Sequence, residues 1–193
     1  MREEPGREPR AVNDARADRE PHLTTGAERD LAVEHWLLSA AEDVRLARAQ
    51  WQESGVALLR CSTLFGAVRV AGDVVHSAAG TSDPVEVSAF LTRMLEGGPV
   101  VFDRASRLYA VLVGPSVGRL REWATLRHAD AEYVGRGRCL AVPPVTAKSP
   151  DGFRVYWSVP MSSPGELAPV DAVSRLLATG RHRMAPQERP GLE

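Results

Sequence analysis

The sequence predicts a single α+β domain in which helices pack against a mixed or antiparallel sheet built from strand pairs. Two observations support this fold class. The chain has 193 residues, of which 44% are hydrophobic, which is enough for one domain with a substantial core and hardly enough for two. Apolar runs typical of strands come as consecutive pairs joined by helices, whereas strict alternation of strands and helices would favour a parallel α/β sheet.

The limits of this domain are expected at residues 25 and 180. Residues 1–24 alternate arginine with acidic residues, and they contain three prolines but no aromatic residue. Such a segment cannot bury enough apolar surface to offset the conformational entropy lost on ordering. We therefore expect residues 1–24 to form a disordered tail, and we expect the same of the polar segment 181–193.

The domain is expected to open with one long amphipathic helix. Thr25 and Glu28 have the spacing of a capping box, and apolar residues then recur at three- and four-residue steps as far as Trp51. Gly55 is expected to end this helix, because glycine readily adopts the left-handed conformation that closes helices.

The remaining elements follow from short apolar runs bounded by turn residues and from apolar residues at helical spacing. In chain order we expect strands at 56–61 and 65–70, a short helix through Val74 and Val75, a helix opening at Asp83-Pro84, a hairpin of strands 99–102 and 108–113, a helix marked by Val117, Leu120 and Trp123, and a last helix through Val170, Val173, Leu176 and Leu177 that stops at Gly180.

Residues 134–160 are interpreted as a surface hairpin that carries arginines and aromatic side chains. The apolar run 140–142 stops at Pro143-Pro144, because proline cannot donate a ladder hydrogen bond. The segment 148–152 supplies turn residues, and a second strand is expected at 153–159.

Composition excludes several broad classes of function. A formal charge of −1 gives no overall field that would attract a polyanion, so any such site must be a local patch. Residues 1–10 lack the apolar centre of a signal peptide, and no apolar run approaches the roughly 18 residues that a membrane helix needs. We therefore expect a cytoplasmic protein with no membrane partner. Cys61 and Cys139 lie far apart outside any Cys-x-x-Cys motif, so we expect both to be buried, with no disulfide framework or zinc site.

One motif has the appearance of a hydrolase site. Gly114-Pro115-Ser116-Val117-Gly118 is a G-x-S-x-G sequence between a predicted strand and a predicted helix, which is the context of a nucleophile elbow. Asp171 and His182 follow in the order serine, acid, histidine. Pro115 restricts the backbone that an elbow would strain, and the ordinary alternative is a turn in which Ser116 caps the next helix.

Two histidine and carboxylate pairs have the spacing of metal ligands, namely Asp73 with His76 and His128 with Asp130. Each pair supplies two ligands, and the sequence does not identify a third. The alternative to metal binding is that Asp73 caps a helix and that His76 is partly buried. No metal site is predicted.

A basic and aromatic segment is the strongest candidate for a binding surface. Between residues 119 and 157, seven cations outnumber four carboxylates, and five aromatic residues lie among them. Guanidinium groups pair with phosphate, and aromatic faces on strands stack on exposed bases. The alternative is that the aromatic residues belong to the core and the arginines to a solvated face. The candidate binding residues are Arg136, Arg138, Lys148, Arg154 and Tyr156, with Gly135 and Gly137 allowing the backbone to approach a ligand.

A family resemblance enters through the same segment. The order Gly135-Arg136-Gly137, then Leu140-Ala141-Val142-Pro143-Pro144, then a turn and Tyr156-Trp157 resembles the closing part of the N-terminal domain of bifunctional DNA primase/polymerases. Segments 98–101 and 109–113 look like the strand pair that this family places earlier, so the resemblance covers about residues 98–160. The chain is similar more closely to small uncharacterised proteins of GC-rich filamentous bacteria that look related to this domain.

The resemblance implies a polymerase site that this chain does not reproduce. In that family two acids in an Asp-x-Asp or Asp-x-Glu motif and a histidine from a later strand hold two metal ions. The strands expected at 56–61 and 65–70 contain no carboxylate, and Asp103 is single and expected in a turn. We therefore expect no catalytic residues, no metal and no cofactor.

The sequence thus predicts a non-catalytic primase/polymerase-like protein that binds nucleic acid or a nucleotide through the expected hairpin. One alternative is a protein-interaction or regulatory module with a protein partner and no nucleic-acid role. The other is a serine hydrolase that uses the G-P-S-V-G turn.

Overall fold

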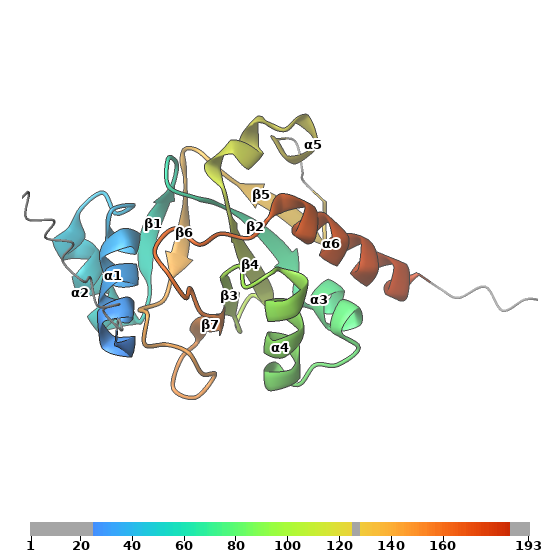
Figure 1. Ribbon diagram of the computed structural model, residues 1–193, viewed down its shortest axis with the longest axis horizontal. Helices are drawn as coiled ribbons and strands as arrows, with labels where there is room; N and C mark the ends of the chain where they lie inside the picture. The colour runs from blue at the N-terminus through green and yellow to red at the C-terminus, as the bar shows by residue number, and fades with distance from the viewer. Residues whose placement is uncertain (1–24, 125–127, 186–193) are drawn as a thin grey trace, which may run out of the picture.

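The computed structural model describes residues 25–124 and 128–185 of the chain. Within these ranges the chain forms the helices α1 (Gly26–Leu38), α2 (Val44–Ser54), α3 (Gly72–Ala79), α4 (Pro84–Met94), α5 (Arg121–Ala124) and α6 (Val170–Met184), the 3-10 helix η1 (Pro115–Arg119), and the strands β1 (Ala57–Cys61), β2 (Gly66–Ala71), β3 (Val100–Asp103), β4 (Leu108–Val113), β5 (Ala131–Val134), β6 (Arg138–Val142) and β7 (Val155–Val159) (Figure 1). The predicted single α+β domain is confirmed. Among the described helices, none is both long and apolar enough to cross a bilayer.

The strands form two antiparallel sheets. The larger sheet has the order β5-β2-β4-β3-β7, and the smaller one pairs β1 with β6. The hairpin predicted at 99–113 is confirmed as β3 and β4, in which Phe102 lies opposite Tyr109. The larger sheet is therefore the central layer of the described fold.

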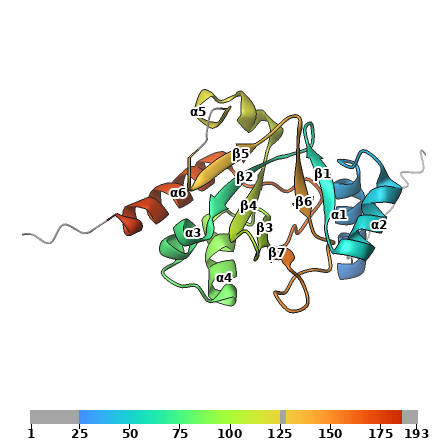
Figure 2. The same ribbon diagram turned by 180° about the vertical axis from the view of Figure 1, so that it is seen from behind.

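Each face of the central sheet buries its own hydrophobic core. Val68 and Val70 of β2 belong to one core with residues of α3, α4 and α6. Ala67, which points to the opposite face of the same strand, belongs to a second core with residues of α1, α2, β1 and β6. Figures 1 and 2 show α1 and α2 with the small sheet at one end of the molecule and α6 extending toward the other.

The long first helix was predicted wrongly, because it is divided into α1 and α2. Asp43 has an extended backbone conformation and accepts hydrogen bonds from the backbone N–H groups of Arg45 and Leu46, so it caps a new helix. The predicted ends are confirmed: Thr25 and Glu28 form the capping box, and Gly55 closes α2 with a φ of 74°. The helical spacing of the apolar residues continues across the break and so did not reveal it.

The hairpin predicted at 134–160 does not exist. The first of its strands, β6, pairs with β1, whereas β7 pairs with β3 at the edge of the central sheet. The strands predicted at 56–61 and 65–70 also form, but as β1 and β2 of different sheets. Closeness in sequence suggested that β6 would pair with β7 and β1 with β2. The pairing of strands depends instead on which of their faces can be buried together.

The end of the last helix was also predicted wrongly. Gly180 lies inside α6, which continues to Met184. A Cβ on Gly180 would overlap the carbonyl oxygen of Val74 in α3, so the glycine allows two helices to approach closely. The tail predicted at 1–24 and the part of the other tail at 186–193 lie outside the described residues.

Candidate functional site

Arg136 lies in the turn between β5 and β6 and lines a cavity of about 570 Å³, which we call the Arg136 cavity. The remaining lining residues are Ser62, Thr63, Pro115, Ser116, Gly118, Arg119 and Tyr133. Neither Arg119 nor Arg136 has a hydrogen bond or ion pair with any other described residue, and both are exposed. Because none of the described residues that line the cavity is a carboxylate, its walls carry two uncompensated positive charges beside four hydroxyl groups, one of them the phenol of Tyr133.

Tyr133 forms one wall of the Arg136 cavity and lies in a slot made by three glycines. A Cβ added to Gly66 would lie 2.6 Å from Tyr133 Oη, a Cβ on Gly118 would lie 2.8 Å from the same atom, and a Cβ on Gly135 would overlap Cε1. Burial raises the pKa of Tyr133 despite a hydrogen bond from the Gly118 backbone, so the phenol stays neutral. Gly118 and Gly135, which sequence motifs had suggested for catalysis and ligand approach, are therefore required by the packing of an aromatic ring.

Arg138, a second predicted binding residue, is engaged within the fold. Its Nη1 atom lies 2.6 Å from Oε1 of Glu132, and Oε2 of the same carboxylate lies 3.9 Å from Nη1 of Arg69. One half-buried carboxylate of β5 thus faces guanidinium groups from β6 and β2. Arg138 joins the small sheet to the central one, and a phosphate would have to compete with Glu132 for it.

Arg154 is more accessible than Arg138, although it too has a partner. Its Nε atom lies 3.4 Å from Oδ1 of Asp103, and 72% of its side chain is exposed. Asp103 is the last residue of β3 rather than part of a turn, which corrects the prediction. Burial alone would raise the pKa of Asp103, but hydrogen bonds from Ser106, Ala105 and Arg154 outweigh it and lower that pKa, so the carboxylate is charged.

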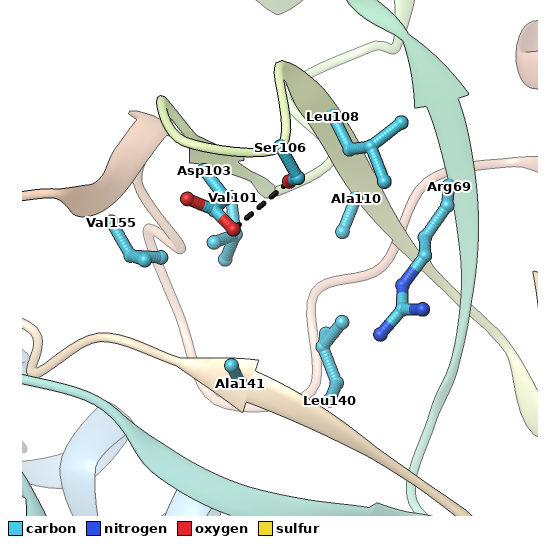
Figure 3. Close-up of a pocket in the computed structure, with 9 residues that line it drawn as sticks. All are labelled: Arg69, Val101, Asp103, Ser106, Leu108, Ala110, Leu140, Ala141 and Val155. Atoms are coloured by element: carbon cyan, nitrogen blue, oxygen red, sulfur yellow. Dashed lines mark hydrogen bonds between the residues drawn. The ribbon is translucent and has the colours of Figure 1, made fainter.

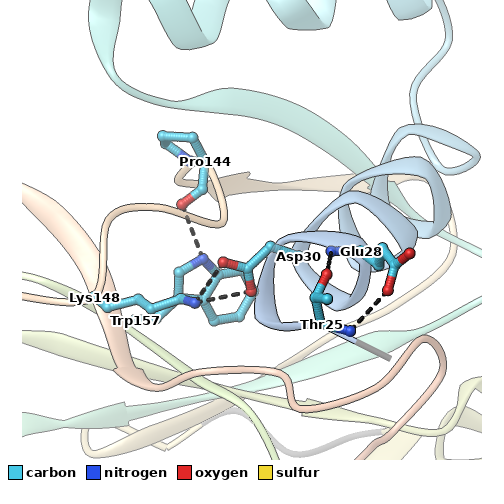
Figure 4. Close-up of polar contacts among 6 residues, drawn as sticks. All are labelled: Thr25, Glu28, Asp30, Pro144, Lys148 and Trp157. Atoms are coloured by element: carbon cyan, nitrogen blue, oxygen red, sulfur yellow. Dashed lines mark hydrogen bonds and ion pairs between the residues drawn. The ribbon is translucent and has the colours of Figure 1, made fainter. Parts of the chain in front are cut away.

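Lys148 and Tyr156 do not line the Arg136 cavity. Lys148 Nζ lies 2.8 Å from both carboxylate oxygens of Asp30 in α1, which ties the segment before β7 to the first helix (Figure 4). Tyr156 is only 5% exposed, and its ring meets that of Phe102 edge to face. Its ring is therefore part of the core contacts of β7, as the structural alternative expected, and is not free to stack on a base.

The serine, acid and histidine of the possible hydrolase do not assemble. Asp171 and His182 are eleven residues apart on α6, which separates them by roughly 16 Å along the helix axis. Oδ2 of Asp171 lies 3.1 Å from Nη1 of Arg175. Ser116 lies inside η1, where Gly114 is the N-cap residue, so the expected capping role of Ser116 is wrong. The serine-hydrolase alternative has no support in the described geometry.

In both histidine and carboxylate pairs with metal-ligand spacing, side chains interact with other residues. Nε2 of His76 lies 3.1 Å from the hydroxyl of Tyr109, and Asp73 pairs with Arg107. Asp130 pairs with Arg181, not with His128. In the described ranges, no three histidine, cysteine, aspartate or glutamate side chains gather into a group that could hold a metal ion.

The two cysteines differ in exposure, which corrects the prediction that both are buried. Cys61 is buried, and burial raises its pKa to about 11, whereas Cys139 is exposed. In the β1–β6 ladder Cys61 lies opposite Arg138 and Cys139 lies opposite Arg60. Because neighbouring residues of a strand point to opposite faces, the two sulfur atoms are directed apart, and both thiols are free.

Sequence reasoning singled out only half of the residues that line this cavity. Arg119 and Tyr133 were counted in the basic and aromatic segment but not selected, and Ser62 and Thr63 lie in the connection between β1 and β2. A short hydroxyl pair between two strands is an ordinary turn signal. Only the fold brings it beside the β5–β6 turn and η1.

Comparisons with known proteins identify no relative. No family model matches the chain, and no curated protein or solved structure shows significant similarity to it. The resemblance to primase/polymerases therefore stays a prediction.

Proposed function

We propose that this chain is a non-catalytic, primase/polymerase-like protein of the cytoplasm that binds nucleic acid or a nucleotide, with a phosphate group in the Arg136 cavity. The observation that carries the proposal is the pair of guanidinium groups of Arg119 and Arg136, which have no partner among the described residues and line a cavity without a carboxylate.

The chemistry of the wall favours phosphate over other ligands. Guanidinium groups present parallel N–H donors that match two phosphate oxygens, and the hydroxyl groups of Ser62, Thr63 and Ser116 can donate to the same group. A cavity of about 570 Å³ lies within the usual range of sites for small ligands, so one nucleotide unit can be accommodated.

The engagement of the strand carboxylates supports a binding function without catalysis. Glu132 faces Arg138 and Arg69, and Asp103 accepts hydrogen bonds from Ser106 and Arg154. The acid pair that the family resemblance would call for is not assembled from these two residues, which lie on β5 and β3 at separate positions of the central sheet.

Fluorescence anisotropy with labelled single- and double-stranded DNA and RNA at two salt concentrations tests this proposal. The affinity of the variant R119A/R136A for nucleic acid should be lower by a factor of about ten or more. The slope of log affinity against log salt concentration should become shallower by about one unit for each arginine removed. The control variant R45A/R93A removes two exposed arginines that do not line this cavity and do not contact a described carboxylate. This variant should bind nucleic acid like the unmodified chain.

Equal affinity of R119A/R136A and the unmodified chain, or no binding at low salt, would overturn the proposal. The protein-interaction alternative would then lead, and the exposed apolar side chains of Leu58 and Val85, 57% and 76% accessible, would be the first to substitute in a search for a protein partner.

A further inference from the structure

A second cavity, of about 200 Å³, lies between the two sheets, and we call it the inter-sheet cavity (Figure 3). It is lined by Arg69, Val101, Asp103, Ser106, Leu108, Ala110, Leu140, Ala141 and Val155. Arg69 of β2 lies directly opposite Glu132 of β5, so these two side chains are on the same face of the central sheet. Tyr133 follows Glu132 in β5, and neighbouring residues of a strand point to opposite faces. The side chains of Arg69 and Tyr133 are therefore on opposite faces of the sheet. The inter-sheet cavity and the Arg136 cavity are therefore separate sites.

One end of the inter-sheet cavity is positively charged. Among the described residues, the only ion-pair partner of Arg69 is Glu132 at 3.9 Å, a carboxylate that Arg138 contacts at 2.6 Å. The Arg69 guanidinium makes no hydrogen bond with a described residue, and its side chain is 31% exposed. In Figure 3 it extends into the cavity toward Leu140, so its donors are open to a ligand.

The opposite end carries a carboxylate. Asp103 accepts hydrogen bonds from the backbone N–H of Ala105, from the hydroxyl of Ser106 and, at 3.4 Å, from Nε of the exposed Arg154. A carboxylate has about four lone-pair positions, so one acceptor position is left for a ligand. Figure 3 shows Asp103 and Ser106 across the cavity from Arg69.

The spacing of these ends suits a short ligand. Arg69 and Val101 are aligned through Ala110, two strands apart, and Asp103 follows Val101 by two residues. On ordinary strand spacings this places the Cα atoms of Arg69 and Asp103 roughly 12 Å apart, and their side chains shorten the gap. The volume is below the usual range for drug-sized ligands, which excludes a nucleotide and leaves room for a few heavy atoms against apolar walls.

We infer that the inter-sheet cavity binds a small zwitterionic amino acid, with its carboxylate on Arg69 and its ammonium group on Asp103. A cation and an anion at opposite ends match a ligand that carries both charges. Leu108, Leu140 and Val155 supply the apolar contacts for the carbon atoms of the ligand.

Isothermal titration calorimetry on the full chain tests this inference with glycine, L-alanine, β-alanine and γ-aminobutyrate. At least one should bind saturably in the millimolar range or below, and its N-acetyl and amide derivatives should each bind about tenfold or more weakly because each lacks one charge. This comparison leaves the protein unchanged, so it does not depend on the folding of a variant.

The variants R69Q and D103N should each weaken binding of the same amino acid by about tenfold, and the exposed-arginine control R93A should not. Absence of saturable binding by all four probes, or equal affinity for the blocked derivatives, would overturn the inference. The result does not depend on the proposed nucleic-acid function, because that function is tested with R119A/R136A and labelled nucleic acid.

Discussion

Tyr133 shows at the scale of single residues how the candidate site is shaped. Its ring occupies a slot that is wide enough only because Gly66, Gly118 and Gly135 have no side chain. The ring in turn forms a wall of the cavity that contains Arg119 and Arg136. The glycines of two apparent functional motifs thus act on the site indirectly, by positioning an aromatic side chain.

The substitution Gly135→Ala should therefore destabilise the protein and displace Tyr133. The new Cβ would overlap the ring, and Gly66 and Gly118 leave the ring little space in which to move, so we expect a loss of about 1–3 kcal/mol in the free energy of unfolding. Urea denaturation measures this loss. The control Gly26→Ala adds a Cβ with no atom within 4 Å and should be neutral or slightly stabilising. Equal stability of the two variants would contradict the slot.

Helix α6 illustrates the scale of secondary-structure elements. Its inward face carries Ala172, Val173, Leu176 and Leu177 into the core that it shares with α3 and α4. Gly180 continues this face at the point where α6 approaches the backbone of α3. The residue type that usually ends helices is used here to bring two helices together, which explains why its position in the sequence was misleading.

Replacing Gly180 with alanine should destabilise the protein, although the same change in an isolated helix would stabilise it by about 1 kcal/mol. The added Cβ would overlap the Val74 carbonyl, so separation of α6 from α3 is expected to cost about 1–3 kcal/mol. Thermal unfolding compared with Ser174→Ala, an exposed change on the same helix, measures the effect. A higher melting temperature for Gly180→Ala would show that the two helices do not pack as described.

At the scale of the whole molecule, the last turns of α6 form hydrogen bonds with parts of the chain that are distant in sequence. Arg181 contacts Asp130 through two hydrogen bonds of 2.6 and 2.9 Å, and Arg183 donates a hydrogen bond of 2.8 Å to the carbonyl of Ala78. Asp130 immediately precedes β5, at the edge of the central sheet. The last turn of α6, beyond the helix end predicted at Gly180, is therefore hydrogen-bonded to the rest of the fold.

The Asp130–Arg181 pair should make stability depend on pH. Hydrogen bonds from Arg181 lower the pKa of Asp130 more than burial raises it. A depressed folded-state pKa stabilises the protein above the ordinary aspartate value near 4, and this stabilisation is lost as the pH falls through the folded-state value. Asp130→Asn should thus lower the melting temperature at neutral pH by an amount that shrinks in acid. Because the side chains of Asp130 and Arg181 are both partly exposed, the loss in the free energy of unfolding should not exceed about 1 kcal/mol.

Thermal unfolding from neutral pH to acid measures this dependence. The control Asp171→Asn removes one member of an exposed pair within α6 and should change stability less at every pH. A constant difference between Asp130→Asn and the unmodified chain across the range would mean that the carboxylate charge does not contribute through Arg181.

The sequence by itself determined the fold class and most local elements of this protein. Thr25 with Glu28, Gly55 and Asp83-Pro84 mark helix ends through interactions among close neighbours in the chain, and all three are confirmed. The β3–β4 hairpin was predictable for the same reason, because its strands are joined by a short turn. Such features depend on local backbone geometry and hydrogen bonding, which a few consecutive residues specify.

Only the tertiary structure decided how distant segments pair and which cations are free. β1 with β6 and β3 with β7 are pairings between segments far apart in sequence, set by which faces can be buried together. Of the predicted binding cations, Arg138, Lys148 and Arg154 have carboxylate partners from other elements, whereas Arg136 has none in the described residues. The sequence determines which side chains are charged. Whether a charged side chain has a partner of opposite charge depends on residues that only folding brings within a few ångströms.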